Sequence, residues 1–172
     1  MIVVVMGVCG CGKTTVGRQL ARAMGAAFVE GDDLHPASNR VKMSSGQPLT
    51  DADRWPWLDA IAAEVRQLVQ DGAAVVVSCS ALKRTYRDRL RKAGDGIHFI
   101  HLAGEQELLA DRLAARSGHF MPPDLLASQL ATLEHPAPDE HALVLDITLD
   151  AENLVQQALQ FTTQWSKEEH VP

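Results

Sequence analysis

The sequence predicts a three-layer α/β protein in which helices flank a five-stranded parallel sheet. Two observations support this prediction. Short apolar runs alternate along the chain with longer segments of helical pattern, and this alternation is typical of parallel strands joined by crossover helices. In addition, the first apolar run leads directly into a glycine-rich turn and then into a helical segment. That order is typical of a strand–turn–helix unit in such a sheet.

Five apolar runs are the predicted strands: Ile2–Met6, Ala27–Glu30, Ala73–Ser78, Ile97–Leu102 and Leu143–Ile147. The segments between and after them are the predicted helices: Lys13–Met24, Asp51–Gln70, Lys83–Lys92, Glu105–Arg116, Asp124–Leu133 and Ala151–Trp165. The helix at 51–70 has the clearest ends, because Thr50 is a favourable N-cap and Gly72 stands just past its last turn.

Three stretches interrupt this alternation, at His35–Pro48, Ser117–Pro123 and Glu134–Glu140, and we expect them to carry specificity. No internal repeat and no interdomain linker is visible, so we expect residues 1–172 to form a single domain. A chain of 172 residues with 46% hydrophobic content is long enough to bury a sizeable core. The polar tail from Ser166 onward is expected to fray.

Composition argues against several classes of protein. The formal net charge of −6 does not suit a protein that binds the phosphate backbone of a nucleic acid. No apolar run approaches the roughly 20 residues needed to cross a bilayer, and the first residues lack the features of a signal peptide, so a cytoplasmic protein without membrane contact is expected. The three cysteines, an odd number, argue against a disulfide framework. Cys9-x-Cys11 also has the wrong spacing for a zinc knuckle.

The strongest local signal is a glycine-rich loop of the pattern G-x-x-x-x-G-K-[ST], which predicts an ATP-binding phosphate loop. Glycines let consecutive backbone N–H groups point at phosphate oxygens, and the following helix adds its positive end. Lys13 supplies charge to the outer phosphates, and Thr14 is expected to bind Mg²⁺. The predicted nucleotide-binding residues are Gly7, Val8, Cys9, Gly10, Cys11, Gly12, Lys13, Thr14 and Thr15. A thiol in this loop can have a lowered pKa, but cysteines at such positions more often serve as small packing residues.

An acidic cluster follows the second predicted strand. Asp32 is the predicted general base, because the carboxyl end of a strand beside a phosphate loop is where open parallel sheets bind their ligands. The same carboxylate can also hold Mg²⁺, in part through water. Glu30, two residues earlier, is a candidate to orient a metal-bound water. The alternative is a solvated acidic turn that caps the next helix, and this alternative is stronger for Asp33 than for Asp32.

Beyond the loop, the sequence resembles the thermoresistant-type gluconokinases, from Val4 to about Ile147. The motifs that carry the resemblance in the first half are Gly31-Asp32-Asp33-Leu34-His35-Pro36, Asn39, Lys42-Met43, Gly46-Gln47-Pro48-Leu49, Asp51, Asp53-Arg54 and Pro56-Trp57-Leu58. Those in the second half are Cys79-Ser80-Ala81-Leu82-Lys83, Tyr86-Arg87, Arg112, Arg116 and Gly118-His119-Phe120. The chain departs from the family at Cys11, where a serine or another small residue is usual, and at Glu30, where an aspartate is usual.

This resemblance implies the P-loop fold shared by nucleoside-monophosphate and shikimate kinases, with a helical substrate-binding region at about 35–58 and a mobile lid at about 112–125. It also implies Mg²⁺-dependent transfer of phosphate from ATP to D-gluconate, and a homodimer. Gluconate is a polyol with one carboxylate, so its pocket needs hydroxyl partners and at least one cation. The candidates are His35, Asn39, Arg54, Lys83, Arg87 and His119. For each basic residue the alternative is a solvated surface charge.

Two arginines are the predicted cations of the lid. Arg112 and Arg116 are four residues apart and share one face of a helix, so together they can close over the transferring phosphoryl group and exclude water. The alternative is a pair of solvated arginines near a helix C-terminus. The segment 133–140 connects the lid region to the last strand, and its topology predicts that it passes the adenine.

The sequence leaves two other functions open. One is a different small-metabolite kinase of the same fold, such as a shikimate or nucleotide kinase. The other is a nucleotide-binding module without catalysis, which would need neither Asp32 nor the paired arginines.

Overall fold

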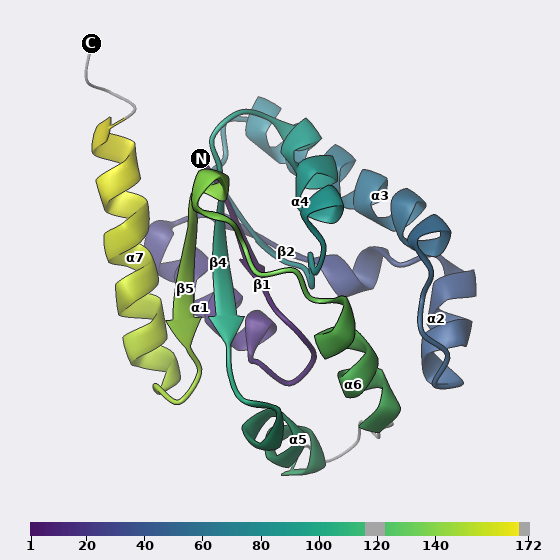
Figure 1. Ribbon diagram of the computed structural model, residues 1–172. Helices are drawn as coiled ribbons and strands as arrows, with labels where there is room; N and C mark the ends of the chain where they lie inside the picture. Colours follow the sequence, from purple (N-terminus) through teal and green to yellow (C-terminus); the bar gives the residue numbers. More distant parts are fainter. Residues whose placement is uncertain (116–122, 169–172) are drawn as a thin grey trace.

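A five-stranded, all-parallel sheet forms the centre of the molecule, as the sequence predicts (Figure 1). The computed structural model describes residues 1–115 and 123–168. The strands are β1 (Ile2–Met6), β2 (Ala27–Glu30), β3 (Val75–Ser78), β4 (Ile97–Ala103) and β5 (Ala142–Asp146). Their spatial order is β2-β3-β1-β4-β5, so β1 lies in the middle. Its first residue, Ile2, stands opposite Val75 of β3 and Ile97 of β4.

Helices cover both faces of this sheet. In the part of the chain that the structure describes they are α1 (Lys13–Met24), α2 (Ala37–Ser44), α3 (Asp51–Gln70), α4 (Arg84–Leu90), α5 (Gln106–Ala115), α6 (Pro123–Thr132) and α7 (Ala151–Glu168). Helices α1 and α7 pack together on one side and α3 and α4 on the other, while α5 and α6 lie beyond the carboxyl ends of the strands (Figure 1). None of these helices is long and apolar enough to span a membrane.

The predicted and observed elements differ mainly in one place. The stretch expected to be irregular at His35–Pro48 contains α2, a helix of eight residues in which only Asn39 is buried. A helix this polar has little hydrophobic pattern to reveal it in the sequence. Short 3₁₀ turns were likewise missed at Gly31–Leu34 and Pro138–Glu140.

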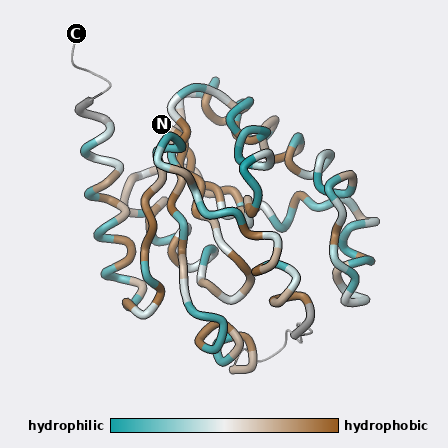
Figure 2. The backbone as a smooth tube through the Cα atoms, viewed as in Figure 1, coloured by the Kyte–Doolittle hydropathy of each residue, from teal (hydrophilic) through white to brown (hydrophobic). Residues whose placement is uncertain are grey.

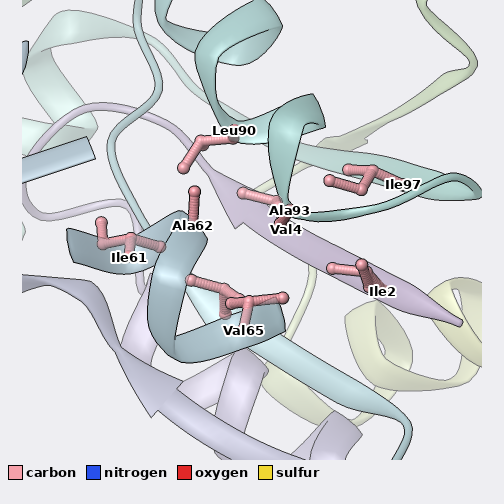
Figure 3. A pocket seen from close by; sticks show the side chains of 9 residues that line it. Ile2, Val4, Ile61, Ala62, Val65, Leu90, Ala93 and Ile97 are labelled. Carbon is pink, nitrogen blue, oxygen red and sulfur yellow. The ribbon is translucent and has the colours of Figure 1, made fainter. Parts of the chain in front are cut away.

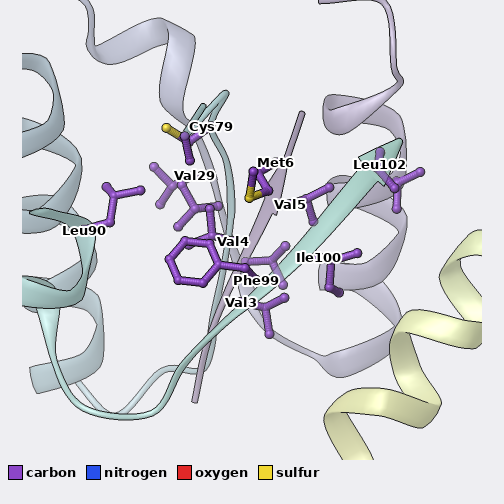
Figure 4. Packing of buried hydrophobic residues seen from close by; sticks show 14 of the residues in the cluster. Val3, Val4, Val5, Met6, Val29, Cys79, Leu90, Phe99, Ile100 and Leu102 are labelled. Carbon is purple, nitrogen blue, oxygen red and sulfur yellow. The ribbon is translucent and has the colours of Figure 1, made fainter. Parts of the chain in front are cut away.

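The core follows from the composition of the strands. Every residue of β1 is buried, as expected for a central strand that is covered on both faces. Figure 4 shows side chains of β1 and β4 projecting to both sides of the sheet, and Figure 2 shows the hydrophobic residues concentrated along the strands and the inner faces of the helices. A small apolar void of about 10 Å³ remains under α3 (Figure 3). It is too small for anything beyond a single water.

A polar network holds α2 against the start of α3. Thr50 caps α3 in a capping box with Asp53, as the sequence suggested for Thr50. The Asp53 carboxylate also accepts from Lys42 Nζ of α2 at 2.6 Å. These bonds hold the pKa of Asp53 at about 2, with the Lys42 hydrogen bond as the largest cause. The two helices that flank the predicted acceptor region are therefore joined through one carboxylate.

Candidate active site

The phosphate loop connects β1 to α1 in a conformation that requires its glycines. Gly7, Gly10 and Gly12 have φ angles of 141°, 79° and 98°, a region that residues with a Cβ rarely adopt. A Cβ on Gly7 would also lie 2.7 Å from the carbonyl oxygen of Leu102 and 2.8 Å from Cys11 Sγ. The loop therefore lies directly on the carboxyl end of β4, and its N–H groups lead into the N-terminus of α1.

Lys13 is held in place by its own loop. Its Nζ donates to the carbonyl oxygen of Val8 at 2.9 Å. Burial by itself lowers the pKa of the ammonium group, but interactions with nearby ionisable side chains, chiefly Cys11 and Asp32, outweigh burial and raise the pKa above its ordinary value. Lys13 is thus a fixed positive charge at the entrance of α1.

The three cysteines are free and buried. Burial raises the pKa of the Cys9 thiol even though Lys13 is close, and it raises the pKa of Cys79 to about 12. Both thiols are therefore protonated at neutral pH. For Cys9, which lies in the loop, this favours the packing interpretation over a reactive thiolate.

A cavity of about 850 Å³ opens at the carboxyl ends of the strands, beside the phosphate loop. It is large enough for a nucleotide and a small acceptor together. The residues predicted from sequence that line it are Cys9, Gly10, Gly12, Lys13, Thr14, Thr15, Asp32, His35, Arg54 and Arg112. These come from the loop, the turn after β2, and helices α3 and α5. The fold thus brings together groups that are up to 103 residues apart, from Cys9 to Arg112.

The turn after β2 carries Asp32 to the cavity wall. Gly31 allows this turn because a Cβ there would collide with the carbonyl oxygen of Ser78 on β3. Asp32 is exposed, and its negative charge acts on Lys13 across the cavity. Glu30 points elsewhere, since its carboxylate accepts a hydrogen bond from Ser78 Oγ. The structure therefore gives Glu30 a role in joining β2 to β3 and does not place it among the cavity residues.

Arg54 is a buried cation that faces the cavity from α3. Its side chain is only 9% exposed, and its guanidinium lies 5.5 Å from the ring centre of Tyr86. Among residues 1–115 and 123–168, no carboxylate forms a salt bridge with it and its Nε has no hydrogen-bond partner. A buried charge without an ion pair is costly. This site is therefore suited to an anionic group of a ligand.

His35 lies beside Arg54 and is held from two sides. Its ring stacks on Trp57 with centroids 4.0 Å apart, and Asn39 Nδ2 lies 3.3 Å from its Nδ1. Asn39 Nδ2 also donates to the Asp53 carbonyl, so it is the amide nitrogen and His35 Nδ1 accepts. Burial, together with Arg54 and Arg40, lowers the pKa of His35 to about 4. His35 is therefore neutral at pH 7 and carries its proton on Nε2.

Three predicted acceptor residues are not brought to the cavity wall. Asn39 positions His35 and does not line the cavity. Lys83 lies outside it, with Nζ 2.8 Å from Asp51 Oδ1. Arg87 is wholly buried and binds both carboxylate oxygens of Glu140, at 2.6 and 2.8 Å, together with three carbonyl oxygens. Each of its three guanidinium nitrogens has a protein partner and the residue is fully buried, so Arg87 stabilises the fold and is not presented to a substrate.

The region predicted as a lid is described only in part. Arg112 lines the cavity, where its Nη2 donates to the carbonyl oxygen of Ile147 at 2.6 Å. Arg116 and His119 lie outside the described residues. The segment 133–140, which was expected to pass the adenine, lies along α4: the Glu134 N–H donates to the carbonyl oxygen of Leu82, and Asp139 pairs with Arg84. None of its residues lines the cavity.

Sequence reasoning missed several residues of the cavity. Arg40 on α2 and Ser80 after β3 line it, as do Ser128 and Gln129 on α6. The side-chain oxygen of Gln129 accepts a hydrogen bond from the backbone N–H of Cys9 at 2.7 Å. A pair 120 residues apart leaves no local pattern that could reveal this contact in the sequence.

Three features define a P-loop kinase that acts on a small molecule: a phosphate loop with a fixed lysine, a carboxylate after the next strand along the chain, and a cavity with a buried cation that has no ion pair within the described part of the chain. Comparison with known proteins supports this class and narrows it. The sequence model of the AAA domain family matches residues 2–136.

Among curated proteins, a gluconokinase of Gluconobacter oxydans is 56% identical over 137 residues, which are 80% of this chain and 77% of that protein. The thermoresistant gluconokinase of Escherichia coli is 41% identical over 160 residues, covering 92% of this chain and 91% of that protein. A solved structure of a gluconokinase from Sinorhizobium meliloti is 46% identical and superposes with a TM-score of 0.87, covering 98% of this chain and 94% of the other. The chain belongs to the gluconokinase family.

Proposed function

We propose that this protein transfers the γ-phosphoryl group of ATP to D-gluconate and forms ADP and 6-phospho-D-gluconate. The observation that carries the proposal is Arg54, a buried cation that shares one cavity with the phosphate loop and has no ion pair among the residues that the structure describes. The family supplies the acceptor, since relatives that cover most of the chain are named gluconokinases.

The nucleotide end of the cavity is built for a polyphosphate. Backbone N–H groups of the loop and the N-terminus of α1 hold phosphate oxygens, and Lys13 neutralises the outer phosphates. Thr14 and Asp32 both line this cavity and offer oxygen ligands, the type of ligand that Mg²⁺ prefers. No cluster of three or more metal-binding side chains occurs within the described ranges, so a bound Mg²⁺ would take its other ligands from phosphates and water. When bound, it would neutralise charge on the phosphates.

The acceptor end provides one site for each kind of group on gluconate. Arg54 holds the carboxylate, because a guanidinium can donate two parallel hydrogen bonds to it. His35, neutral and with its proton on Nε2, donates to a hydroxyl group. The opposite end of the sugar acid is then free to extend toward Asp32 and the phosphate loop.

Asp32 takes the proton of the attacking hydroxyl. The hydroxyl oxygen forms a bond to the γ-phosphorus, the bond from that phosphorus to the bridging oxygen breaks, and its electron pair stays on the β-phosphate of ADP. Lys13 stabilises the charge that develops on the bridging side. In this proposal, acid–base chemistry and charge neutralisation act at opposite sides of the transferred group.

We further propose that residues 1–172 act as one kinase domain, with a substrate-binding region at about 35–58 and a lid at about 112–125 that carries Arg112, Arg116 and His119. By resemblance to its family the protein is proposed to be a cytoplasmic homodimer. Size-exclusion chromatography with light scattering tests the dimer, which a monomer mass would refute.

The test of the proposed function is ADP release by the purified protein with Mg²⁺-ATP and a panel of gluconate, shikimate, AMP and other sugar acids. Turnover confined to gluconate, and lost in Asp32→Asn, supports both the acceptor and the base. Turnover with shikimate or AMP alone would assign a different kinase. No acceptor-dependent turnover with any compound would favour a nucleotide-binding module.

A further inference from the structure

The peptide bond between Val8 and Cys9 is held from both sides. Its carbonyl oxygen accepts from Lys13 Nζ at 2.9 Å, and its N–H donates to Gln129 Oε1 at 2.7 Å. Lys13 belongs to the phosphate loop itself, whereas Gln129 comes from α6 and also lines the cavity. One peptide unit of the loop therefore connects the lysine of the motif to the Gln129 side chain, which lies outside the motif.

The contact fixes the orientation of the Gln129 amide. A backbone N–H can only donate, so the accepting atom must be the amide oxygen, and the other branch of the amide is the NH₂ group. Within the described residues no hydrogen bond engages this NH₂ group, and Gln129 lines the cavity. Gln129 thus presents two unused N–H donors, anchored through its oxygen, to the space beside the loop.

The position of the shared peptide indicates which phosphate these donors meet. In a phosphate loop the backbone N–H groups hold the inner phosphates, and the lysine reaches the β- and γ-phosphates. Since Lys13 binds the oxygen of the Val8–Cys9 peptide, that peptide lies at the outer end of the triphosphate. The carboxylate of Asp32 lines the same cavity, so the transferred group would lie between Asp32, Lys13 and Gln129.

We propose that Gln129 is a further catalytic residue, whose NH₂ group donates to an oxygen of the γ-phosphoryl group while its Oε1 stays on the loop. This inference rests on the proposed kinase function. An anchored neutral amide suits the task, because it offers a donor of fixed direction that needs no reorganisation as charge develops on the phosphoryl oxygens. Loss of one such donor lowers kcat by about a hundredfold to a thousandfold in well-studied sites.

Two substitutions separate this role from simple anchoring of α6. Gln129→Glu keeps an oxygen acceptor for the Cys9 N–H but replaces the NH₂ group with a carboxylate oxygen. Gln129→Leu removes both groups at similar size. Ala131→Glu is the matched control, since it adds the same charge at an exposed position of the same helix. The variants are compared in kcat, in KM, and in the Kd values of ADP and of a non-hydrolysable β,γ-imido analogue of ATP, all with Mg²⁺.

We expect Gln129→Glu to lower kcat by about a hundredfold or more. It should also weaken binding of the ATP analogue at least tenfold more than binding of ADP. Gln129→Leu is expected to show the same selectivity with a smaller loss, and Ala131→Glu to match the wild type. Near-normal kcat in Gln129→Glu would mean that the oxygen contact is only an anchor and would overturn the proposal.

Tighter binding of both nucleotides by Gln129→Leu would also overturn it, because Gln129 would then be a placeholder that ATP must displace. If Gln129→Glu weakened the binding of ADP and of the analogue equally, Gln129 would have a structural role, which would also overturn the proposal. The nucleotide measurements use no acceptor, so they test Gln129 even if the wild-type protein fails to phosphorylate gluconate.

Discussion

Replacing Arg54 with methionine removes the proposed partner of the gluconate carboxylate and keeps most of the side-chain volume. Arg54 is 91% buried, forms no salt bridge in the described part of the chain, and faces the cavity. The substitution should therefore affect an acceptor with a carboxylate and spare one without it. Glucitol is the matched acceptor, because it has the same carbon chain and hydroxyl pattern but an alcohol in place of the carboxylate.

The size of the effect follows from the type of bond that is lost. Hydrogen bonds to a charged group contribute about 1.5–3 kcal/mol, and each factor of ten corresponds to about 1.4 kcal/mol. Arg54→Met is therefore expected to lower kcat/KM for gluconate by about 10- to 150-fold. The free energy of unfolding should stay equal or rise, since a buried charge without an ion pair is replaced by an apolar group.

The assay is steady-state ADP release with saturating Mg²⁺-ATP, run on wild type and variant with gluconate and with glucitol. We expect glucitol to be a poor acceptor for the wild type and Arg54→Met to leave its kcat/KM within about threefold, because the carboxylate contact is already missing. An equal fall in kcat/KM for both acceptors would refute the assignment, since Arg54 would then shape the cavity without binding the carboxylate.

Three further predictions concern the fold around the site. Arg87→Met should lower the free energy of unfolding in urea by up to about 3–5 kcal/mol, because it leaves the buried Glu140 carboxylate with only the longer ion pair to Arg91, at 3.6 Å; a loss below about 1 kcal/mol would contradict a stabilising role of the Arg87–Glu140 pair. Burial, foremost among its causes, lowers the pKa of His101 to about 4 from an ordinary value of 6.5, so the unfolded chain binds a proton that the folded protein does not. This contribution to the free energy of unfolding is complete above pH 6.5 and is lost as the pH falls toward 4. We expect His101→Phe to reduce the change of the unfolding free energy with pH, measured by urea titrations at pH 7, 5.5 and 4.5. The same pH dependence in wild type and variant would show that other groups cause it. Gly31→Ala should lower kcat by about tenfold or more, because its Cβ must displace the turn that carries Asp32; an unchanged kcat would show that the turn is adaptable.

The sequence predicts the sheet and most helices because their signals are local. Buried runs such as Ile2–Met6 and the Thr50 cap depend on residues next to one another, and their predicted bounds match the structure at 2–6 and 51–70. Helix α2 was missed because its stability comes from contacts with α3, through Lys42 and Asn39, and not from an apolar stripe of its own.

The residues of the site also fall into those that a local sequence pattern marks and those that only the fold brings into place. The phosphate loop and Asp32 could be predicted because a motif and its neighbouring strand fix them. Arg87 could not be told from Arg54 in the sequence, since both are basic residues in helical segments, and only the fold shows that Glu140 already neutralises Arg87. Gln129 had no signal at all, because its partner lies 120 residues away.

Transfer of the γ-phosphoryl group from ATP to gluconate in this cavity fixes the ratio of the products. This ratio is measured by quantifying ADP, phosphorylated gluconate and inorganic phosphate in one reaction with wild-type protein. We expect one phosphogluconate, substituted at the terminal hydroxyl, for each ADP, with little inorganic phosphate. ADP matched by inorganic phosphate, with no phosphorylated acceptor, would contradict it.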